Sequence, residues 1–209
     1  MPILGDGMHL KRIEVENFKS FGGEMVIPFD EGFTAITGPN GSGKSNSGDA
    51  IQFVLGPKST KALRASNVSE LIFNGGGRGK AAKHMSVTLV FANVPEHDGR
   101  RRLRIDDDEV SFTRSVRLNR KGEPISSFRI GEKPSTATEM RRVLAEAGLR
   151  GDGYNIVLQG DVTNLATMTP HKRRGVLEEV AGVTAYDDEI RRANTQRKHV
   201  ESSIETIDL

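Results

Sequence analysis

The eight residues Gly38-Pro39-Asn40-Gly41-Ser42-Gly43-Lys44-Ser45 constrain this chain more than any other stretch of its sequence. They match the phosphate-loop pattern in full, with glycine at both fixed positions followed by Lys and Ser. Glycines let the backbone approach a phosphate closely, and the N–H groups of such a loop converge on the anion. We expect Lys44 to reach the β- and γ-phosphates and the Ser45 hydroxyl to ligate magnesium. The motif predicts nucleotide binding but does not decide between ATP and GTP, or whether hydrolysis follows.

The residues on either side of the loop suit this interpretation. Phe33–Thr37 (FTAIT) predicts a short buried strand before the loop, and residues 45–55 predict a helix after it, with Ala50 and Val54 facing inward. A chance glycine-rich turn would not supply both flanking elements. The sequence therefore predicts a strand, a phosphate loop and a helix in succession, as in α/β nucleotide-binding proteins.

Other segments predict strands and one further helix. Alternation of apolar and polar residues indicates strands near residues 13–15, 24–29, 86–92, 109–118 and 125–130, with a hairpin turn at 119–122. Thr136 and Glu139 form a capping box that begins a second helix, which Gly148 ends.

From Val183 onward, apolar side chains recur at intervals of three and four. The positions are Val183, Tyr186, Ile190, Ala193, Val200, Ile204 and Ile207. This spacing fits the seam of a coiled coil. An ordinary amphipathic helix gives the same pattern over so short a stretch, so periodicity alone leaves both alternatives open.

Composition excludes several classes of protein. The 209 residues include no cysteine, which excludes a disulfide scaffold, a thiol nucleophile and cysteine-ligated zinc. Thirty basic residues against 28 acidic ones give a net charge of +2, so any nucleic-acid contact must be local. The five histidines are dispersed without metal-binding spacing, and no apolar run approaches the roughly 18 residues of a membrane helix.

Four stretches of the sequence resemble the N-terminal part of the SMC (structural maintenance of chromosomes) chromosome-partition ATPases, of prokaryotic type. They are residues 10–23, 33–56, 61–76 and 152–187, and their most specific strings are GPNGSGKSN and GYNIVLQGD. The resemblance implies an α/β fold, that of a P-loop NTPase of the ABC-ATPase head type with a mixed β-sheet. Residues 1–170 would form the N-terminal lobe of the head, and residues 171–209 a helix leading into an antiparallel coiled coil.

The resemblance also implies roles for individual residues with ATP and Mg2+ as cofactors. Gln159 would bind magnesium together with Ser45 and orient the attacking water, although an ordinary polar residue at a strand end is the alternative. Arg64 would approach the phosphates and neutralise charge in the transition state. Lys19 would lie near phosphate or ribose, unless it is a solvated surface lysine. The remaining residues expected to contact the nucleotide are Ser20, Asn40, Gly41, Ser42, Gly43 and Asn46.

The implied partners are the C-terminal half of the same head, a second SMC head, double-stranded DNA and a kleisin-type subunit. The implied location is the cytoplasm, with the nucleoid and without membrane association. The family's signature Ser-Gly-Gly motif and catalytic Glu are not found in this sequence, so we expect the 209 residues alone to be inactive. Candidate DNA contacts are Lys58, Lys61, Arg120 and Lys121, whereas we expect acidic residues 106–109 to neutralise the arginines at 100–104.

Two alternative functions stay open at this point. One is the head of a related DNA-repair ATPase with a similar coiled coil. The other is a mainly structural module in which ATP clamps two heads and the basic surface grips DNA.

Overall fold

The computed structural model describes residues 8–56, 60–77, 79–151 and 167–180, and further on residues 190, 193–198 and 200–201. The chain divides into two compact units, residues 1–152 and residues 153–209. The first unit contains the sheet and the phosphate loop, and the second contains helix α4 (Pro170–Val180). The boundary after residue 170 that we expected from the sequence stays a prediction.

A six-stranded sheet forms the centre of the first unit, in the order β2-β1-β3-β4-β5-β6. Its strands are β1 Leu10–Phe18, β2 Phe21–Pro28, β3 His84–Ala92, β4 Glu109–Leu118, β5 Pro124–Ile130 and β6 Lys133–Ser135. The five predicted strands around the alternating segments are confirmed, and β6 is an addition. Every pairing among the described residues is antiparallel.

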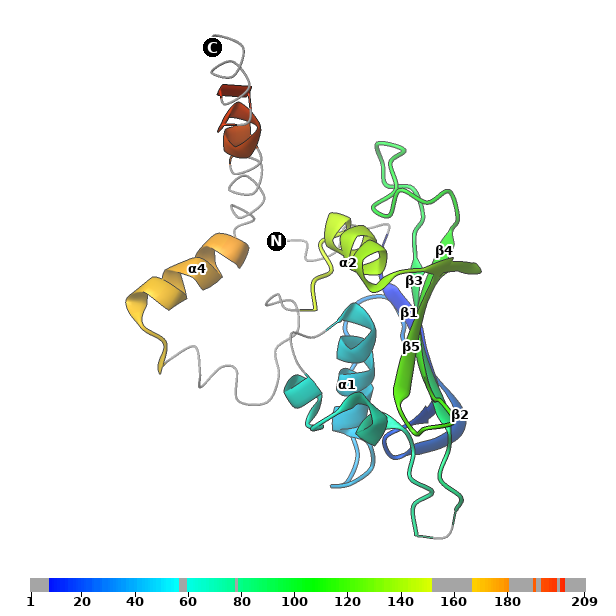
Figure 1. The fold of residues 1–209 in the computed structure, drawn as a ribbon. Coiled ribbons are helices and arrows are strands. Elements are labelled where there is room, and N and C mark those ends of the chain that lie inside the picture. Colours follow the sequence, from blue (N-terminus) through cyan, green and yellow to red (C-terminus); the bar gives the residue numbers. More distant parts are fainter. Residues whose placement is uncertain are drawn as a thin grey trace. The chain divides into compact units, whose positions relative to one another are not determined.

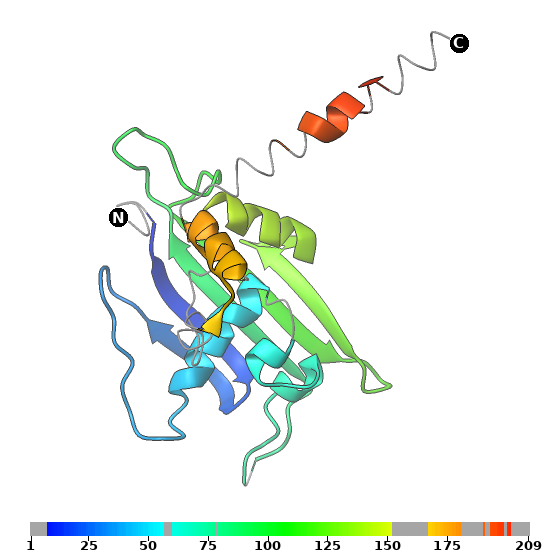
Figure 2. The same cartoon turned by 90° about the vertical axis from the view of Figure 1, so that its left-hand side faces the viewer.

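One face of this sheet carries the core. Ile13, Leu89 and Phe112 are neighbours across β1, β3 and β4, and all three are fully buried. Helices α1 (Lys44–Leu55) and α2 (Ala137–Glu146) cover this face (Figures 1 and 2). The opposite face is polar, as the hydrogen bond of 2.8 Å between the hydroxyls of Thr88 and Thr113 illustrates. This division follows from the period-two alternation of side chains along a strand.

The predicted helix boundaries are confirmed. The Thr136 hydroxyl accepts a hydrogen bond of 3.1 Å from the Glu139 backbone N–H and so caps α2. The Glu139 carboxylate pairs with Arg142 in the next turn at 2.6 Å. Two short 3-10 helices, η1 (Thr60–Leu63) and η2 (Val68–Leu71), connect α1 to the third strand.

The predicted strand at Phe33–Thr37 is wrong. The structure has an irregular segment there, in which Phe33 is 96% exposed and Ile36 is 44% exposed. A strand needs a neighbour to satisfy its N–H and C=O groups, and the sheet formed by the described residues has its edges at β2 and β6. The segment is rich in residues that favour strands, but the described residues offer it no neighbouring strand with which to pair.

The heptad segment lies mostly outside the described residues, including Val183, Tyr186, Ile204 and Ile207. Its described residues are helical, and Ile190 and Val200 are exposed. The coiled coil stays a prediction. None of the helices in the described part of the chain is long and apolar enough to cross a membrane.

Candidate nucleotide site

The phosphate loop enters α1 through a glycine in the left-handed region. Gly43 is the residue before the helix, with a φ of 95°, and α1 has no side-chain cap. A Cβ atom at Gly43 would lie 2.8 Å from the ring of Phe21 on β2, and Gly41 also has a positive φ of 83°. The first N–H groups of α1 therefore follow a loop whose backbone favours glycine at residues 41 and 43. Such a helix start is suited to binding an anion.

Lys44 folds over the loop that precedes it. Its ammonium donates hydrogen bonds of 2.7 Å to the carbonyl oxygens of Gly38 and Pro39. An ammonium has three N–H donors, so these contacts leave one for a ligand. The positive charge of Lys44 thus lies against the first residues of the loop, and Lys44 itself begins the uncapped helix α1.

The turn between β1 and β2 is attached to α1 at two points. The amide of Asn46 donates a hydrogen bond of 2.7 Å to the Ser20 hydroxyl, and Lys19 forms an ion pair with Asp49. The Lys19 ammonium also donates to the Leu63 carbonyl at 2.6 Å, and its side chain is only 13% exposed. The alternative of a solvated surface lysine is therefore wrong for Lys19. Both residues of this turn contact the phosphate-loop helix. Their contact with a nucleotide stays a prediction.

Asp49 is a site residue that sequence reasoning missed. Its side chain is 5% exposed and pairs with both Lys19 and Arg64. The available signal was an acidic residue on the inward face of α1, because a buried carboxylate requires a cationic partner. Asp49 brings together two residues, Lys19 and Arg64, that the resemblance had assigned separately.

The loop residues fit the phosphates of a nucleotide. Gly43, the uncapped N–H groups and Lys44 provide donors and positive charge in one place. Ser45 follows in the first turn of α1, where its hydroxyl would supply one oxygen ligand to the magnesium ion that accompanies the phosphates. Among the described residues no cluster of acidic, His or Cys side chains could hold a metal ion by itself. Gln159, the second expected magnesium ligand, lies outside the described residues.

The predicted basic residues differ in their surroundings. Arg120 and Lys121 are exposed in the turn between β4 and β5, where the Asn119 side chain accepts a hydrogen bond of 2.8 Å from the Lys121 N–H. Lys58 lies outside the described residues, and Lys61 falls in η1 without a described side chain.

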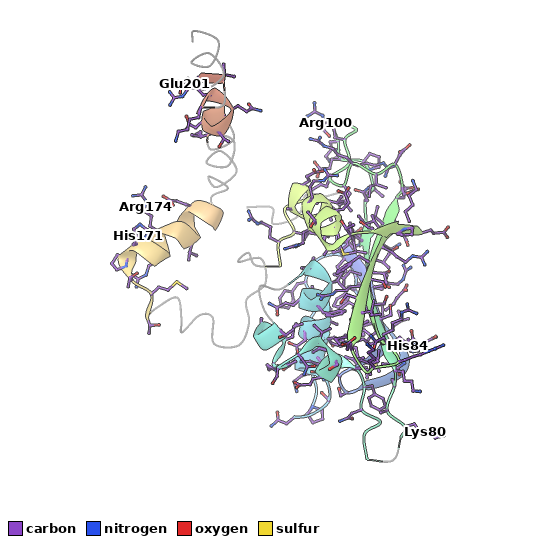
Figure 3. The ribbon with its side chains drawn as sticks, in the orientation of Figure 1. Lys80, His84, Arg100, His171, Arg174 and Glu201 are labelled. Atoms are coloured by element: carbon purple, nitrogen blue, oxygen red, sulfur yellow. The ribbon has the colours of Figure 1, made fainter. Side chains whose placement is uncertain are left out.

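The arginine run at 100–104 lies among acidic residues, as expected. Arg101 pairs with Asp106 at 3.4 Å and with Asp108 at 2.7 Å. Figure 3 shows Arg100 and Lys80 at opposite ends of the first unit, so their loops do not form one basic surface.

Arg114 is a second residue whose position was not foreseen. It occupies a core-facing position on β4, with its guanidinium carbon 4.3 Å from the centre of the Phe53 ring. Its Nη1 donates a hydrogen bond of 2.8 Å to the Phe53 carbonyl, near the C-terminal end of α1. Burial, and to a lesser extent the charge of Arg141, lowers the pKa of Arg114, although a guanidinium stays protonated at neutral pH. A cation at this end of the helix is favourable and ties α1 to the sheet.

Comparisons with known proteins identify the family of this chain. Residues 9–153 match the family described as RecF/RecN/SMC N terminal domain. The chromosome partition protein Smc of Pyrococcus furiosus is 41% identical over 202 residues, which are 96% of this chain and 16% of that protein. The chain thus spans about one sixth of the length of this curated relative.

Solved structures give the same result. A chain from a structural study of ATP-driven dimerization and DNA-stimulated activation of SMC ATPases has a TM-score of 0.71 and 44% identity. That match covers 82% of this chain and 99% of the other. The Smc head domain of Pyrococcus furiosus, solved with an extended coiled coil and bound to the C-terminal domain of ScpA, has a TM-score of 0.78 and 41% identity. It matches 97% of this chain and 49% of that one. The chain belongs to the RecF/RecN/SMC N terminal domain family, in which it is the N-terminal part of an SMC head domain.

Proposed function

We propose that this chain is the ATP-binding lobe of an SMC head that works in chromosome partition. In the complete protein, ATP held between two heads would drive their engagement on DNA, and hydrolysis would release them. The observation that carries this proposal is the phosphate loop, with Lys44 folded over its carbonyl oxygens and the start of α1 left uncapped. The chain's similarity to proteins named chromosome partition protein Smc favours this function over a role in DNA repair.

The roles that we propose for the site residues come from the similarity to SMC heads. Lys44 would neutralise the β- and γ-phosphates, while Ser45 and Gln159 would bind magnesium. Lys19 and Ser20 are joined to α1 and so would border the nucleotide. Arg64 is 51% exposed beside Lys19, which suits a cation that meets charge developing on the phosphates. Asn40, Gly41, Ser42, Gly43 and Asn46 would line the phosphates.

The head would be completed by further chains or segments. The exposed segment 33–37 carries apolar side chains that suit a strand, which supports the C-terminal half of the head as its partner. The solved head bound to the C-terminal domain of ScpA supports a kleisin-type subunit as a further partner. Neither a signature motif nor a catalytic Glu is found in the sequence, so the C-terminal half would supply the catalytic Glu and a second head would supply the signature motif.

DNA would bind through basic residues of the head, and Arg120 and Lys121 are exposed in the structure. Arg120 and Lys121 take part in none of the ion pairs found among the described residues, in contrast to Arg101. Lys58 and Lys61 complete the candidate set. Contacts of this kind involve phosphate and not base edges, so binding would weaken steeply with salt. We place the protein in the cytoplasm with the nucleoid.

Binding of Mg-ATP to the complete protein, with and without Lys44→Ala, tests the proposal. We expect Lys44→Ala to weaken ATP binding severely and to abolish turnover, because it removes the charge at the mouth of the loop. Lys133→Ala, an exposed lysine on β6, is the matched control and should behave like the wild type. Unchanged ATP affinity in Lys44→Ala would contradict the proposal.

The same variant separates the structural alternative. If DNA binding is the main activity, Lys44→Ala will retain full DNA affinity although turnover is lost. If ATP-driven engagement is the main activity, partition function will be lost together with turnover.

A further inference from the structure

Asp49 joins two residues of the candidate site through a single buried carboxylate. Its Oδ2 accepts hydrogen bonds from both the Lys19 ammonium and the Arg64 guanidinium. With 5% exposure, the carboxylate is removed from water, and an unpaired charge in such a place is strongly destabilising. Together the two cations and one carboxylate leave a net positive charge beside the phosphate-loop helix.

The two cations have different surroundings. Lys19 is 13% exposed and has the Leu63 carbonyl as a second acceptor, so it is the buried counter-charge of Asp49. Arg64 is 51% exposed and contacts Asp49 through Nη2. The contact with Asp49 orients the Arg64 guanidinium. Because a guanidinium carries five N–H donors, other donors still face solvent.

The backbone at both cations is held in an unusual conformation. Lys19 has a φ of 52° and Arg64 a φ of 55°, in the left-handed region that residues other than glycine rarely adopt. The Lys19 N–H donates to the Leu71 carbonyl at 2.7 Å, and the Ala65 N–H closes a turn onto the Thr60 carbonyl at 3.2 Å. Strain of this kind persists only where the surroundings fix it, and here it occurs at both residues that reach Asp49.

The position of Asp49 on α1 connects this cluster to the phosphate loop. Asp49 follows Ser45 by four residues, so the two lie on the same face of the helix, with Cβ atoms roughly 5–6 Å apart. Asn46, three residues before Asp49, bonds to Ser20, the neighbour of Lys19. The cluster thus borders the start of α1, where the phosphates would bind.

We propose that Asp49 is a positioning residue that fixes the Arg64 guanidinium with its free donors toward the phosphates of a bound nucleotide. Lys19 balances the charge of Asp49, so the carboxylate orients Arg64 without repelling the phosphates. This inference rests on the proposed function. Asp49 would therefore affect the rate of turnover through Arg64 and leave the affinity for ATP unchanged.

A double-mutant cycle in the complete protein tests the proposal. Asp49→Asn keeps the size of the side chain and an oxygen acceptor for Lys19 but removes the charge that holds Arg64. We expect kcat to fall roughly tenfold or more with KM unchanged, because orientation affects the reacting state more than binding. Arg64→Gln should give a similar loss, and Asp49→Asn combined with Arg64→Gln should lose no more than Arg64→Gln alone. Asp49→Glu keeps the buried charge, and its kcat should lie between those of the wild type and Asp49→Asn.

The controls separate the possible outcomes. Glu139→Gln removes a carboxylate that pairs with an arginine on α2 and should leave kcat unchanged. Wild-type or raised kcat in Asp49→Asn would overturn the inference, as would additive losses in the double variant or a loss confined to KM. If Asp49→Asn does not fold, Asp49→Glu decides, and wild-type kcat in that variant overturns the inference. Turnover that survives Lys44→Ala would instead refute the proposed function.

Discussion

Gly43 shows how one backbone conformation shapes the candidate site. Its φ is 95°, and a Cβ atom at this position would lie only 2.8 Å from the Phe21 ring, which leaves no room for a larger residue. We expect Gly43→Ala to distort the phosphate loop and to weaken ATP binding at least about tenfold, since L side chains are strained in this region. Titration of the complete protein with ATP measures this effect.

Gly48 provides the matched control on the same helix. A Cβ atom at Gly48 would meet no atom within 4 Å, so Gly48→Ala should leave ATP affinity unchanged. It should also stabilise α1 by about 0.5–1 kcal/mol, because alanine is a better helix former than glycine. Equal ATP affinities in the two variants would show that the loop tolerates a side chain at residue 43.

We expect Arg114 to stabilise the fold by joining α1 to the sheet. Arg114→Ala removes the contact with the Phe53 ring and leaves the Phe53 carbonyl without its donor. We expect the free energy of unfolding to fall by about 2–4 kcal/mol, from lost packing and an unpaired buried acceptor. Chemical denaturation measures it, and Arg117→Ala, at an exposed position on the same strand, is the control. Equal stabilities would mean that Arg114 does not tie α1 to the sheet.

For single residues, the sequence predicts the site positions that a local motif determines. The phosphate loop identifies Lys44 and Ser45 because their spacing is fixed within eight residues. Asp49 and Arg114 escaped prediction because their partners lie far away in the sequence. Asp49 meets Arg64 across 15 positions and Lys19 across 30, and Arg114 meets Phe53 across 61.

Among the strands, the ion pairs of Glu109 at one end of the sheet should make the stability of the fold depend on pH. Hydrogen bonds from Lys11 and then Arg12 on β1 lower the pKa of Glu109, at the start of β4, below its ordinary value of 4.5. A lowered pKa in the folded state means that the carboxylate stabilises the fold above the unfolded pKa. That contribution is lost as pH falls through the folded pKa.

Glu109→Gln should therefore flatten the acid limb of the stability curve. Above pH 4.5 we expect the wild type to be more stable than the variant by at most about 1 kcal/mol, because Glu109 is exposed. Below the pKa of Glu109 in the folded protein, this difference in stability should disappear. Unfolding measured from pH 3 to 7 gives the result, with Glu132→Gln in the turn after β5 as control. A difference that grows on acidification would contradict the assigned ion pairs.

The elements also show where sequence patterns stop being informative. The strands β1 and β3–β5 were predicted because alternation marks a sheet with one buried face. The capping box placed α2 correctly because the cap is a local contact. The pattern at 33–37 failed because a strand depends on a neighbour, and the described part of this chain provides none.

For the whole molecule, the exposed segment at 33–37 predicts an interface. If the C-terminal half of the head covers Phe33, burial of this side chain would contribute about 1.5–3 kcal/mol to association. Phe33→Ser should therefore weaken binding of the C-terminal half roughly tenfold or more without unfolding the sheet. Ile125→Ser, at an exposed position on β5, is the matched control. Equal affinities in the two variants would place the interface elsewhere.

We propose that this chain contributes the nucleotide-binding half of a catalytic head. Steady-state ATP turnover, measured for the chain alone and for the chain mixed with the C-terminal half, tests the claim most directly, with Lys44→Ala as control in both samples. We expect no turnover by the chain alone and turnover that requires Lys44 in the mixture. Brisk turnover that requires Lys44 in the chain alone would contradict it, because the catalytic carboxylate would then lie within these 209 residues.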